Sequence, residues 1–523
     1  MIRFMRHREE VCSASSLRRW QDHLPAGVTL TGPDLTAGAS LPAVWAEAWG
    51  SLARRPLLRV AGGPEATGWV TADEFEQRTR MFALRLAEFG LGEGDRVGLS
   101  LGRDVQSVVA WAGVLRAGGV TAVPLNPQLT EREVRHVVAD ASPAAAVVAD
   151  AWTAGVLARA GVPLVLGPDL RVLHGEAGAS RKGQVTIDQA SGADAALVCY
   201  TSGTTGAPKG AVLSHANLLA NSRALAVAWR WEPGDRLLHV LPLFHGHGLC
   251  AALYTSLLVG GSVVLMPGFD LSATLDAIGS HAATLFFGVP TMYHRLAASG
   301  RAGELAPLRL AVSGSAPLAA GLHRRIAAQG TVVLERYGMT ETLLTVSNPS
   351  DGERRAGTVG FPLPGMEACI DPGSGQVLVR GPQVFGGYLR RPAQSAEVFA
   401  DGWFCTGDLG EVDDGYLRLL GRAGDVVICG GFNVYPAEVE DVLLGHPAVT
   451  EVAVSGTPSE EWGEVVTAWV VPDASVPRPD DLIDDIERFA AVRLAPYKRP
   501  RLVRLVPSLP RNAMGKILRS ELR

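Results

Sequence analysis

The stretch Tyr200-Thr-Ser-Gly-Thr-Thr-Gly-Ala-Pro-Lys209-Gly210 follows directly on the apolar run Ala195-Ala-Leu-Val-Cys199. An apolar run that ends in a Ser/Thr/Gly loop is typical of a buried strand leading into a phosphate-binding turn. Glycines let backbone N–H groups turn inward around an anion, hydroxyls add donors, and Lys209 supplies a positive charge. The spacing is not that of a Walker A loop. A flexible surface loop has a similar composition, but the preceding strand and the lysine favour a nucleotide-phosphate site.

Length and composition predict a multi-domain globular protein. A chain of 523 residues is too long for a single hydrophobic core, so two or more domains are expected. Hydrophobic residues make up 47% and charged residues 19%, which is typical of a globular chain and not of a disordered one. The net charge of −5 argues against nucleic acid or an anionic membrane as the main partner.

The cysteines and the apolar segments bear on location. Six scattered cysteines form no CxxC pair, which indicates reduced thiols in a cytoplasmic protein. The N-terminus has basic residues but lacks the apolar core of a secretory signal. The segment 246–269 has no charged side chain, but Gly260-Gly261 divides it. We therefore expect a core helix followed by a strand, and no stable membrane insertion.

The chain has an ordered succession of patterns. Residues 1–40 are irregular and are expected to form a leading arm. Apolar helical stretches then alternate with short apolar strands up to about residue 345, which predicts βα units on mostly parallel sheets and an α/β fold class. Residues 355–420 have short strands and Gly/Pro/Asp turns, which indicate a small β-rich subdomain. The last hundred residues are expected to form a compact α+β domain.

Two clusters have the chemistry to serve the phosphate loop. In Glu335-Arg-Tyr-Gly-Met-Thr340-Glu341, a Thr–Glu pair could contact an α-phosphate and hold Mg²⁺ through a carboxylate oxygen. Tyr337 offers a flat face for adenine. Asp408, at the end of a turn, is suited to bind a ribose diol. The alternatives are an acid at a helix N-terminus for Glu341 and an ordinary turn residue for Asp408.

Two further clusters are ambiguous when taken alone. Lys516 lies beside a glycine near the C-terminus and could be an ordinary surface lysine. His245 and His247 lie beside glycines at a strand-to-helix junction, where they could be structural histidines or could face a binding site. These clusters occur in a fixed order over more than 300 residues of the chain. That order is more specific than any single motif.

The ordered motifs resemble those of the adenylate-forming superfamily, which contains acyl-CoA synthetases, peptide-synthetase adenylation domains and luciferases. The resemblance covers roughly residues 45–523. It rests on residues 200–210, Tyr337-Gly-Met-Thr-Glu341, Thr406-Gly-Asp408, Gly421-Arg422 and Pro510-Arg-Asn-Ala-Met-Gly-Lys516.

The resemblance implies an acid–CoA ligase that works in two half-reactions. ATP and a carboxylic acid give an acyl-adenylate and pyrophosphate, and the thiol of coenzyme A then displaces AMP. The site must supply cations and N–H donors, because adenylation concentrates negative charge on the phosphates. A standalone acyl-carrier protein could replace coenzyme A as the thiol partner. The presence of Lys516 and Glu341 argues against a non-catalytic nucleotide-binding protein.

The resemblance also implies residue roles. The catalytic residues are Lys516, Glu341, Thr340 and His245, and Mg²⁺ is held by Glu341 and Thr204. Lys516 reaches the bridging oxygen and the acid, Thr340 contacts the α-phosphate, and Asp408 bonds the ribose with help from Arg422. The implied nucleotide-binding set is Thr201, Ser202, Gly203, Thr204, Thr205, Gly206, Lys209, Gly314, Ser315, Ala316, Glu335, Arg336, Tyr337, Gly338, Met339, Asp408 and Arg422. Gly430, Gly431 and Phe432 correspond to the strip that binds coenzyme A.

The resemblance further implies a mobile small domain. Lys516 must leave the site before the thiol attacks, and family members rotate the C-terminal domain between the half-reactions. We expect a large adenylation domain over residues 41–421, a hinge over 422–425 and a small domain over 426–523. Gly424 lies at the pivot, where the family usually has a charged or polar residue. Glycine absorbs large backbone changes, so rotation stays possible.

The sequence says least about the acid. The segments around His245, Gly288 and Ser313 look most like those of malonate and methylmalonate CoA ligases. We expect Arg295 to pair with the distal carboxylate of a small diacid through a bidentate contact. The expected acid-binding set is His245, Gly288, Arg295, Ser313, Gly314 and Met339. The alternatives are that Arg295 faces solvent, and that Gly246, Gly288 and Gly314 leave room for a larger apolar or aryl acid.

Overall fold

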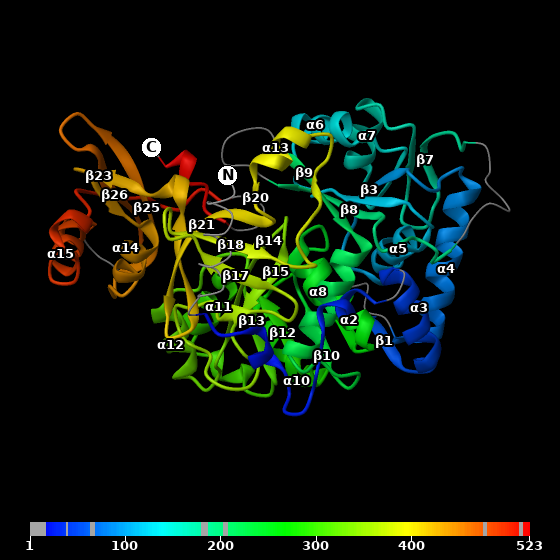
Figure 1. Ribbon diagram of the computed structural model, residues 1–523, viewed down its shortest axis with the longest axis horizontal. Helices are drawn as coiled ribbons and strands as arrows, with labels where there is room; N and C mark the ends of the chain where they lie inside the picture. The colour runs from blue at the N-terminus through cyan, green and yellow to red at the C-terminus, as the bar shows by residue number, and fades with distance from the viewer. Residues whose placement is uncertain are drawn as a thin grey trace.

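The computed structural model describes residues 17–37, 40–62, 68–178, 187–201, 208–473, 479–511 and 516–522. Figure 1 shows a large body, coloured blue through yellow, and a smaller C-terminal part in orange and red at one end. The mixture of parallel sheets and covering helices confirms the predicted α/β fold class. The large N-terminal domain and the smaller C-terminal domain are described in turn.

The first sheet of the large domain has the strand order β19-β9-β8-β4-β3-β5-β6-β7. The strands β4, β3, β5, β6 and β8 run parallel, as expected from the βα alternation. The strand bounds are Arg96–Ser100 (β3), Thr121–Pro124 (β4), Ala145–Val148 (β5), Leu164–Leu166 (β6), Val172–Gly175 (β7), Ala195–Thr201 (β8), Lys209–Ser214 (β9) and Gly387–Tyr388 (β19). The apolar run before the phosphate loop is therefore a strand of this sheet.

The second sheet has the order β16-β15-β14-β13-β12-β10-β11-β1-β2. Its central strands are short and parallel. They are apolar because helices cover both faces of such a sheet. The bounds are Pro56–Val60 (β1), Val70–Thr71 (β2), Arg236–His239 (β10), Ser262–Leu265 (β11), Leu285–Gly288 (β12), Leu310–Ser313 (β13), Leu334–Met339 (β14), Leu343–Ser347 (β15) and Phe361–Pro362 (β16).

Helices between the strands pack on these two sheets. Many of them begin with a side-chain cap: Asp104, Thr130 and Ser214 each accept a backbone N–H in the first turn. The bounds are Trp20–His23 (η1), Gly32–Thr36 (α2), Leu41–Leu52 (α3), Ala72–Glu88 (α4), Val105–Arg116 (α5), Glu131–Ala141 (α6), Ala151–Arg159 (α7), His215–Ala228 (α8), His247–Tyr254 (η2), Thr255–Val259 (α9), Leu271–Ser280 (α10), Pro290–Ala298 (α11), Ala302–Leu305 (η3), Ala320–Ala327 (α12) and Pro392–Glu397 (α13).

The uncharged segment 246–269 forms a buried helix and a strand, as predicted. The helix begins with a π-helical stretch, η2, continues as α9 and ends at Gly260 in the left-handed conformation, before β11. In the described part of the chain, no helix is both long and apolar enough to cross a bilayer.

A third, antiparallel sheet completes the large domain and matches the expected β-rich region. Its strands are Glu367–Ile370 (β17), Gln376–Arg380 (β18), Phe399–Ala400 (β20), Trp403–Asp413 (β21) and Tyr416–Arg422 (β22). The hairpin β21–β22 pairs Asp408 with Arg422 at one end and Asp413 with Tyr416 at the other. This hairpin leads straight into the short turn Ala423–Asp425 (η4), where we predict the hinge.

The C-terminal domain has its own sheet and its own hydrophobic core. Its elements are Val427–Cys429 (β23), Phe432–Val434 (β24), Pro436–Leu443 (α14), Val449–Ser459 (β25), Gly463–Pro472 (β26), Pro479–Ala491 (α15), Pro496–Lys498 (η5), Leu502–Leu505 (β27) and Arg519–Glu521 (η6). Figure 1 shows α15 at the far left and β23, β25 and β26 between it and the large domain. The domain bounds given above stay a prediction.

The cysteines differ from the expectation in one respect. Cys199, Cys250 and Cys429 are free thiols, whereas Cys369 on β17 is disulfide-bonded. The expectation that all six thiols are reduced is therefore wrong at Cys369. That expectation rests on the absence of close CxxC pairs, which does not exclude a cysteine bonded at another spacing.

Candidate active site

The phosphate-loop motif joins two neighbouring antiparallel strands. Thr201 at the end of β8 lies opposite Lys209 at the start of β9. The predicted phosphate-binding residues Ser202, Gly203, Thr204, Thr205 and Gly206 lie outside the described residues. The Lys209 ammonium lies 5.3 Å from the centre of the Tyr388 ring, within the range of a cation–π contact.

The Thr340–Glu341 pair lies in the tight connection between β14 and β15. A Cβ at Gly338 would lie 1.9 Å from the carbonyl oxygen of Leu343, so only glycine allows the two strands to approach so closely. Leu343 adopts a left-handed conformation with φ 53°. The turn brings Glu341 back against the body of the domain, where its side chain is 6% exposed.

Glu341 is a buried carboxylate that no described residue pairs with in an ion pair. The Tyr388 hydroxyl donates a hydrogen bond to its Oε1 at 3.0 Å. Burial raises the pKa of Glu341, although the hydrogen bonds to the carboxylate act in the opposite direction. A buried carboxylate without a cationic partner is costly, and a divalent cation would remove that cost. The residue therefore fits the magnesium ion that the motif implies.

Asp408, Arg422 and Tyr337 come together at the end of the β21–β22 hairpin. Arg422 pairs with Asp408 through Nε at 2.9 Å, and the Tyr337 hydroxyl donates to Asp408 Oδ2 at 2.5 Å. Burial and the neighbouring Asp408 raise the pKa of Tyr337, so the phenol keeps its proton. The structure thus joins the predicted adenine residue to the predicted ribose residue.

Lys516 of the small domain reaches this same group. Desolvation and the nearby Arg422 lower the pKa of Lys516, while Asp408 and Asp425 raise it. The charges at the hairpin end that carries Asp408 and Arg422 therefore act on the Lys516 ammonium. Asp408 and Arg422, about a hundred positions before Lys516 in the sequence, thus share one electrostatic environment with it.

A second group lies where β12 and β13 end and β14 begins. Gly288, Ser313 and Glu335 are neighbours in these strands. Burial and the adjacent Arg336 lower the pKa of His245 to about 4 and that of His247 well below its usual value, so both histidines are neutral at pH 7. His247 Nδ1 lies 3.2 Å from the Ser315 hydroxyl, and Ser315 adopts a left-handed φ of 72°.

Arg336 is the most unusual member of this group. It is 6% exposed, and its Nε and Nη2 make no hydrogen bond with any described residue. Burial lowers the pKa of Arg336 to about 9, opposed by Glu335. Among the described residues of this group, the Oγ of Ser313, the Nε2 of His247 and the Oε2 of Glu335 are also buried without a hydrogen-bond partner. Unpartnered buried donors cost about 1–3 kcal/mol each, so the group is suited to receive an anion.

Two of the three glycines expected to leave room for a larger acid have side chains close beside them. A Cβ at Gly314 would lie 2.1 Å from Arg336 Cζ, and one at Gly288 would lie 3.0 Å from the Tyr293 ring. Arg336 and Tyr293 therefore already fill the space beside these glycines. Of the three glycines expected to leave room for the acid, Gly246 alone has open space: a Cβ built there meets nothing within 4 Å.

Arg295 is exposed, so no described contact supports its expected acid-binding role, which stays a prediction. This arginine lies on α11, where Tyr293 is buried and donates a hydrogen bond to the Val312 carbonyl at 3.0 Å, whereas Arg295 is exposed. Two residues along a helix correspond to about 200° of rotation, which places Arg295 on the opposite face. The exposed position agrees with the alternative that Arg295 faces solvent.

The remaining predicted residues lie apart from these two groups or at their edges. Gly430 and Gly431 form the turn between β23 and β24, and exposed Phe432 stacks on Tyr497 with ring centres 4.8 Å apart. Gly424 is exposed, and a Cβ built there meets nothing within 4 Å. Met339, Thr340 and Ala316 are partly buried at the ends of their strands.

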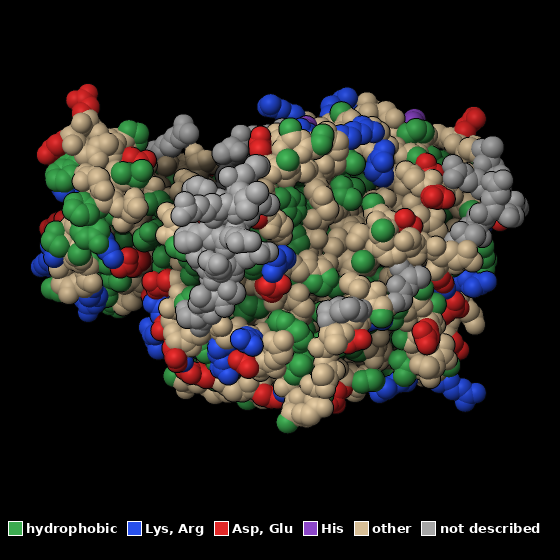
Figure 2. All heavy atoms as spheres, viewed as in Figure 1, with side chains coloured by type: hydrophobic (Ala, Val, Ile, Leu, Met, Phe, Trp, Pro, Cys, Tyr) green, Lys and Arg blue, Asp and Glu red, His purple; other side chains and the backbone are tan. Residues whose placement is uncertain are grey.

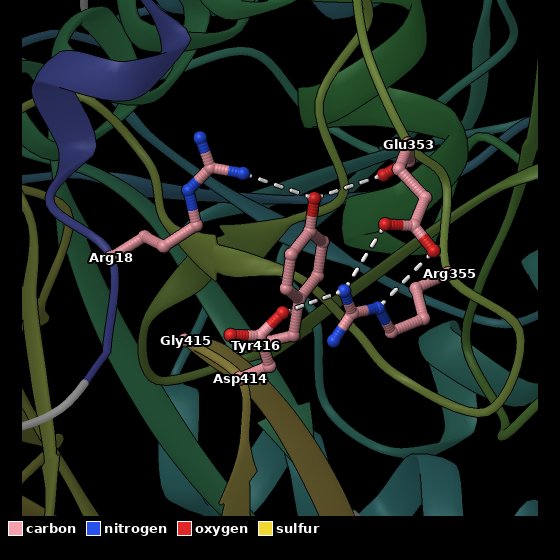
Figure 3. Close-up of a pocket in the computed structure, with 6 residues that line it drawn as sticks. All are labelled: Arg18, Glu353, Arg355, Asp414, Gly415 and Tyr416. Carbon is pink, nitrogen blue, oxygen red and sulfur yellow. Dashed lines mark hydrogen bonds and ion pairs between the residues drawn. The ribbon is translucent and has the colours of Figure 1, made fainter.

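A separate polar recess lies at the opposite end of the β21–β22 hairpin. Figure 3 shows Arg18, Glu353, Arg355, Asp414, Gly415 and Tyr416 around a cavity of about 460 Å³. Here the charges are paired: Arg355 contacts both Glu353 and Asp414 at 3.1 Å, and Arg18 donates to the Tyr416 hydroxyl at 3.2 Å. In contrast to Arg336, these side chains satisfy one another.

Comparison with known proteins agrees with this geometry. Residues 48–389 match the AMP-binding enzyme family, and residues 438–516 match its C-terminal domain. The chain belongs to the AMP-binding enzyme family. It is an AMP-forming acid–CoA ligase, an adenylate-forming enzyme that uses ATP, Mg²⁺ and coenzyme A.

Three relatives show how similar this chain is to known proteins. The feruloyl-CoA synthase of Amycolatopsis sp is 36% identical over 90% of this chain and 97% of the relative. The crystal structure of ATP-bound MatB from Rhodopseudomonas palustris is 39% identical, covers 92% of this chain and 98% of its own, and has a TM-score of 0.83. A malonyl-CoA ligase with methylmalonyl-CoA and AMP bound is 40% identical over 92% of this chain and 100% of its own, with a TM-score of 0.63. At similar identity, the TM-score is higher for the ATP-bound structure.

Sequence reasoning missed two features of the site. Tyr388 was not singled out, although the aromatic residue after Gly386-Gly387 was a possible signal. Arg336 is predicted to bind the nucleotide, and this role stays a prediction; side chains alternate along a strand, so Arg336 points away from the side on which Tyr337 meets Asp408.

Proposed function

We propose that the acid activated by this ligase is a small dicarboxylic acid of the malonate type. The single observation that carries the proposal is the buried Arg336 guanidinium with unpartnered N–H groups. A carboxylate can accept two parallel hydrogen bonds from such a group, which gives both energy and orientation. The distal carboxylate of a diacid would bind there, while its other carboxylate reacts with ATP.

The neighbours of Arg336 support the same substrate. His245 and His247 are neutral and add polar atoms without charge, and the Ser313 hydroxyl can donate a further hydrogen bond. Tyr293 and Arg336 fill the space beside Gly288 and Gly314, which disfavours a large aryl or medium-chain acid. Arg336 thus takes the role that sequence reasoning gave to Arg295.

The nucleotide roles are proposed on the second group. Glu341 would hold Mg²⁺, which neutralises charge on the phosphates during adenylation. Asp408 would accept hydrogen bonds from the ribose hydroxyls, held in place by Arg422 and Tyr337. Thr340 and Lys209 would contact phosphate oxygens. Lys516 would donate to the oxygen between the α- and β-phosphates, where negative charge develops as that bond breaks.

The test is a comparison of two arginine variants. Arg336→Leu is expected to raise KM for malonate about 100-fold, because about 2–3 kcal/mol of charge-assisted hydrogen bonding is lost. KM for a monocarboxylate such as propionate should change far less. Arg295→Leu is the matched control, because Arg295 is exposed, and it should leave KM for malonate unchanged.

Other outcomes have clear meanings. If Arg336→Leu weakens malonate and propionate equally, the residue does not bind the distal carboxylate. If the wild-type enzyme consumes coenzyme A with ferulate and not with malonate, the acid is a larger one. Release of free malonyl-CoA would identify coenzyme A, not a carrier protein, as the thiol partner.

A further inference from the structure

Tyr388 links parts of the nucleotide group that are far apart in the sequence. It lies on β19, which pairs antiparallel with β9, so Tyr388 is opposite Ala211 in the strand that begins with Lys209. The backbone N–H of Leu389 donates to the Gly210 carbonyl at 2.8 Å. The short strand is thus fixed to the edge of the phosphate-loop hairpin.

The same segment holds Glu341 at two points. The backbone N–H of Phe385 donates to the Glu341 carbonyl at 2.8 Å, and the Tyr388 hydroxyl donates to its carboxylate at 3.0 Å. The Phe385 and Tyr388 rings pack edge to face with centres 4.9 Å apart. One contact fixes the backbone of Glu341 and the other fixes the orientation of its carboxylate.

Tyr388 is itself held in place. Its backbone N–H donates to the Ser395 hydroxyl at 2.8 Å, and that hydroxyl donates to the Arg391 carbonyl at 2.8 Å. The side chain of Asn217, from α8, donates to the Pro382 and Val384 carbonyls at 2.7 and 3.0 Å. The segment before Tyr388 is therefore anchored to a helix of the large domain.

We propose that Tyr388 is a positioning residue for the metal-binding carboxylate. Its hydroxyl orients Glu341, and its ring and strand keep that carboxylate in register with Lys209 on the phosphate-loop hairpin. The inference rests on the proposed role of Glu341 as the magnesium ligand. Tyr388 touches neither the metal nor the acid; it acts through Glu341 and Lys209.

The physical reason is the freedom of a lone carboxylate. A glutamate side chain has several rotamers, and only some direct an oxygen toward the ion. Hydrogen bonds to ligating groups select the productive orientation, and their loss typically reduces metal affinity about 10- to 100-fold. Because Glu341 makes no ion pair with any described residue, the Tyr388 hydroxyl carries much of this selection.

The first experiment measures metal binding without turnover. Mn²⁺ is titrated into the full-length protein with an ATP analogue whose α,β-bridging oxygen is a methylene group, and free Mn²⁺ is followed by electron paramagnetic resonance. Tyr388→Phe keeps the ring and removes the hydroxyl, and it is expected to weaken Mn²⁺ binding about 10-fold or more. Glu341→Gln is the reference for loss of the ligand itself.

Tyr416→Phe is the matched control. Tyr416 is 2% exposed and its hydroxyl contacts Arg18 and the Glu353 carbonyl, so the variant also deletes one bonded phenol hydroxyl, but in the recess of Figure 3. It should bind Mn²⁺ as the wild type does. An equal loss in Tyr416→Phe would overturn the inference, because any lost hydroxyl would then suffice.

The Glu341→Gln variant separates the inference about Tyr388 from the proposed role of Glu341 as the magnesium ligand. If Glu341→Gln loses Mn²⁺ binding and Tyr388→Phe does not, the inference about Tyr388 fails while the role of Glu341 stands. If Glu341→Gln also binds Mn²⁺ normally, the proposed metal site itself is wrong.

A second measurement uses the whole enzyme. In Tyr388→Phe, raising Mg²⁺ should restore kcat for adenylation, because the defect lies in metal affinity. A loss of kcat that saturating Mg²⁺ leaves in place would overturn the inference. Tyr388→Leu, which also removes the ring beside Lys209, is expected to raise KM for ATP further than Tyr388→Phe does; equal KM values would exclude the part assigned to the ring.

Discussion

The large domain and the small domain contribute to the nucleotide group in different ways. On the large-domain side, hydrogen bonds of 2.5–3.0 Å join Tyr337 to Asp408 and Tyr388 to Glu341, all in buried or half-buried positions. On the small-domain side, Lys516 comes from a separate sheet and core. One bond between the domains is from the Ala320 N–H, at the start of α12, to the Asp441 carboxylate of α14 at 3.0 Å.

This difference fits two separate tasks. A buried mesh of hydrogen bonds holds the nucleotide-binding side chains in one geometry, which is useful for a site that must be complementary to a charged transition state. Figure 2 shows the small domain as a separate lobe at one end of the molecule. The bond between Ala320 and Asp441 is exposed, and an exposed contact between domains can break and re-form at low cost, as the proposed rotation requires.

Lys516→Ala should give the largest effect. Adenylation, measured as acid-dependent exchange of pyrophosphate into ATP, is expected to fall about 100-fold or more, because a donor to the developing charge is lost. Thioester formation from supplied malonyl-adenylate should be unaffected. Equal loss of both half-reactions would show that the small domain contributes more than this lysine to both steps.

Gly424→Pro should act on the opposite half-reaction. Proline restricts the backbone at the predicted pivot, so the thiol step is expected to slow about tenfold, which corresponds to about 1.4 kcal/mol of added barrier. Gly424→Ala is the milder control, since the structure has space for its Cβ. Single-turnover kinetics of each half-reaction would measure the change, and an unaffected thiol step would place the pivot elsewhere.

Asp441→Ala tests the contact between the domains. The N-cap of α12 is Ala319, which has no side-chain cap, so Asp441 supplies the acceptor from the small domain. Loss of such a cap costs about 1 kcal/mol, and adenylation should slow up to about fivefold. The thiol step should not slow. Asp441→Asn keeps an acceptor oxygen and should behave as the wild type; a defect as large as that of the alanine variant would argue against the cap.

The smallest expected effect is a difference in pH profile. Desolvation and Arg422 lower the pKa of Lys516, and in the proposed role the lysine must be protonated to donate its hydrogen bond. Adenylation should therefore decline as pH rises through this lowered pKa, at a lower pH than for an ordinary lysine. The thiol step from supplied adenylate does not use Lys516 and should lack this decline. Superimposable alkaline limbs for the two half-reactions would contradict the assignment.

The order of the motifs predicted much of this protein. The strand before residues 200–210 and the strand before Thr340–Glu341 follow from local patterns of apolar runs, whereas Asp408, expected at the end of a turn, lies within β21. The α/β class and the smaller C-terminal domain follow from how these patterns alternate and change. They are local properties, because each depends on residues close together in the chain.

The positions of Arg295 and Arg336 show what local sequence patterns do not predict. Both arginines lie near predicted acid-binding segments, and the sequence favoured Arg295. The packing of Tyr293 under α11 turned Arg295 outward, while the alternation along β14 turned Arg336 inward beside Gly314.

The sequence by itself determined the chemistry, because the residue types needed to bind a nucleotide and activate an acid stand in recognisable local order. Only the tertiary structure decided which arginine is left without partners and which tyrosine holds Glu341. Those outcomes depend on which side of a helix or strand is buried and on contacts between segments such as β14 and β19 that lie far apart in the chain.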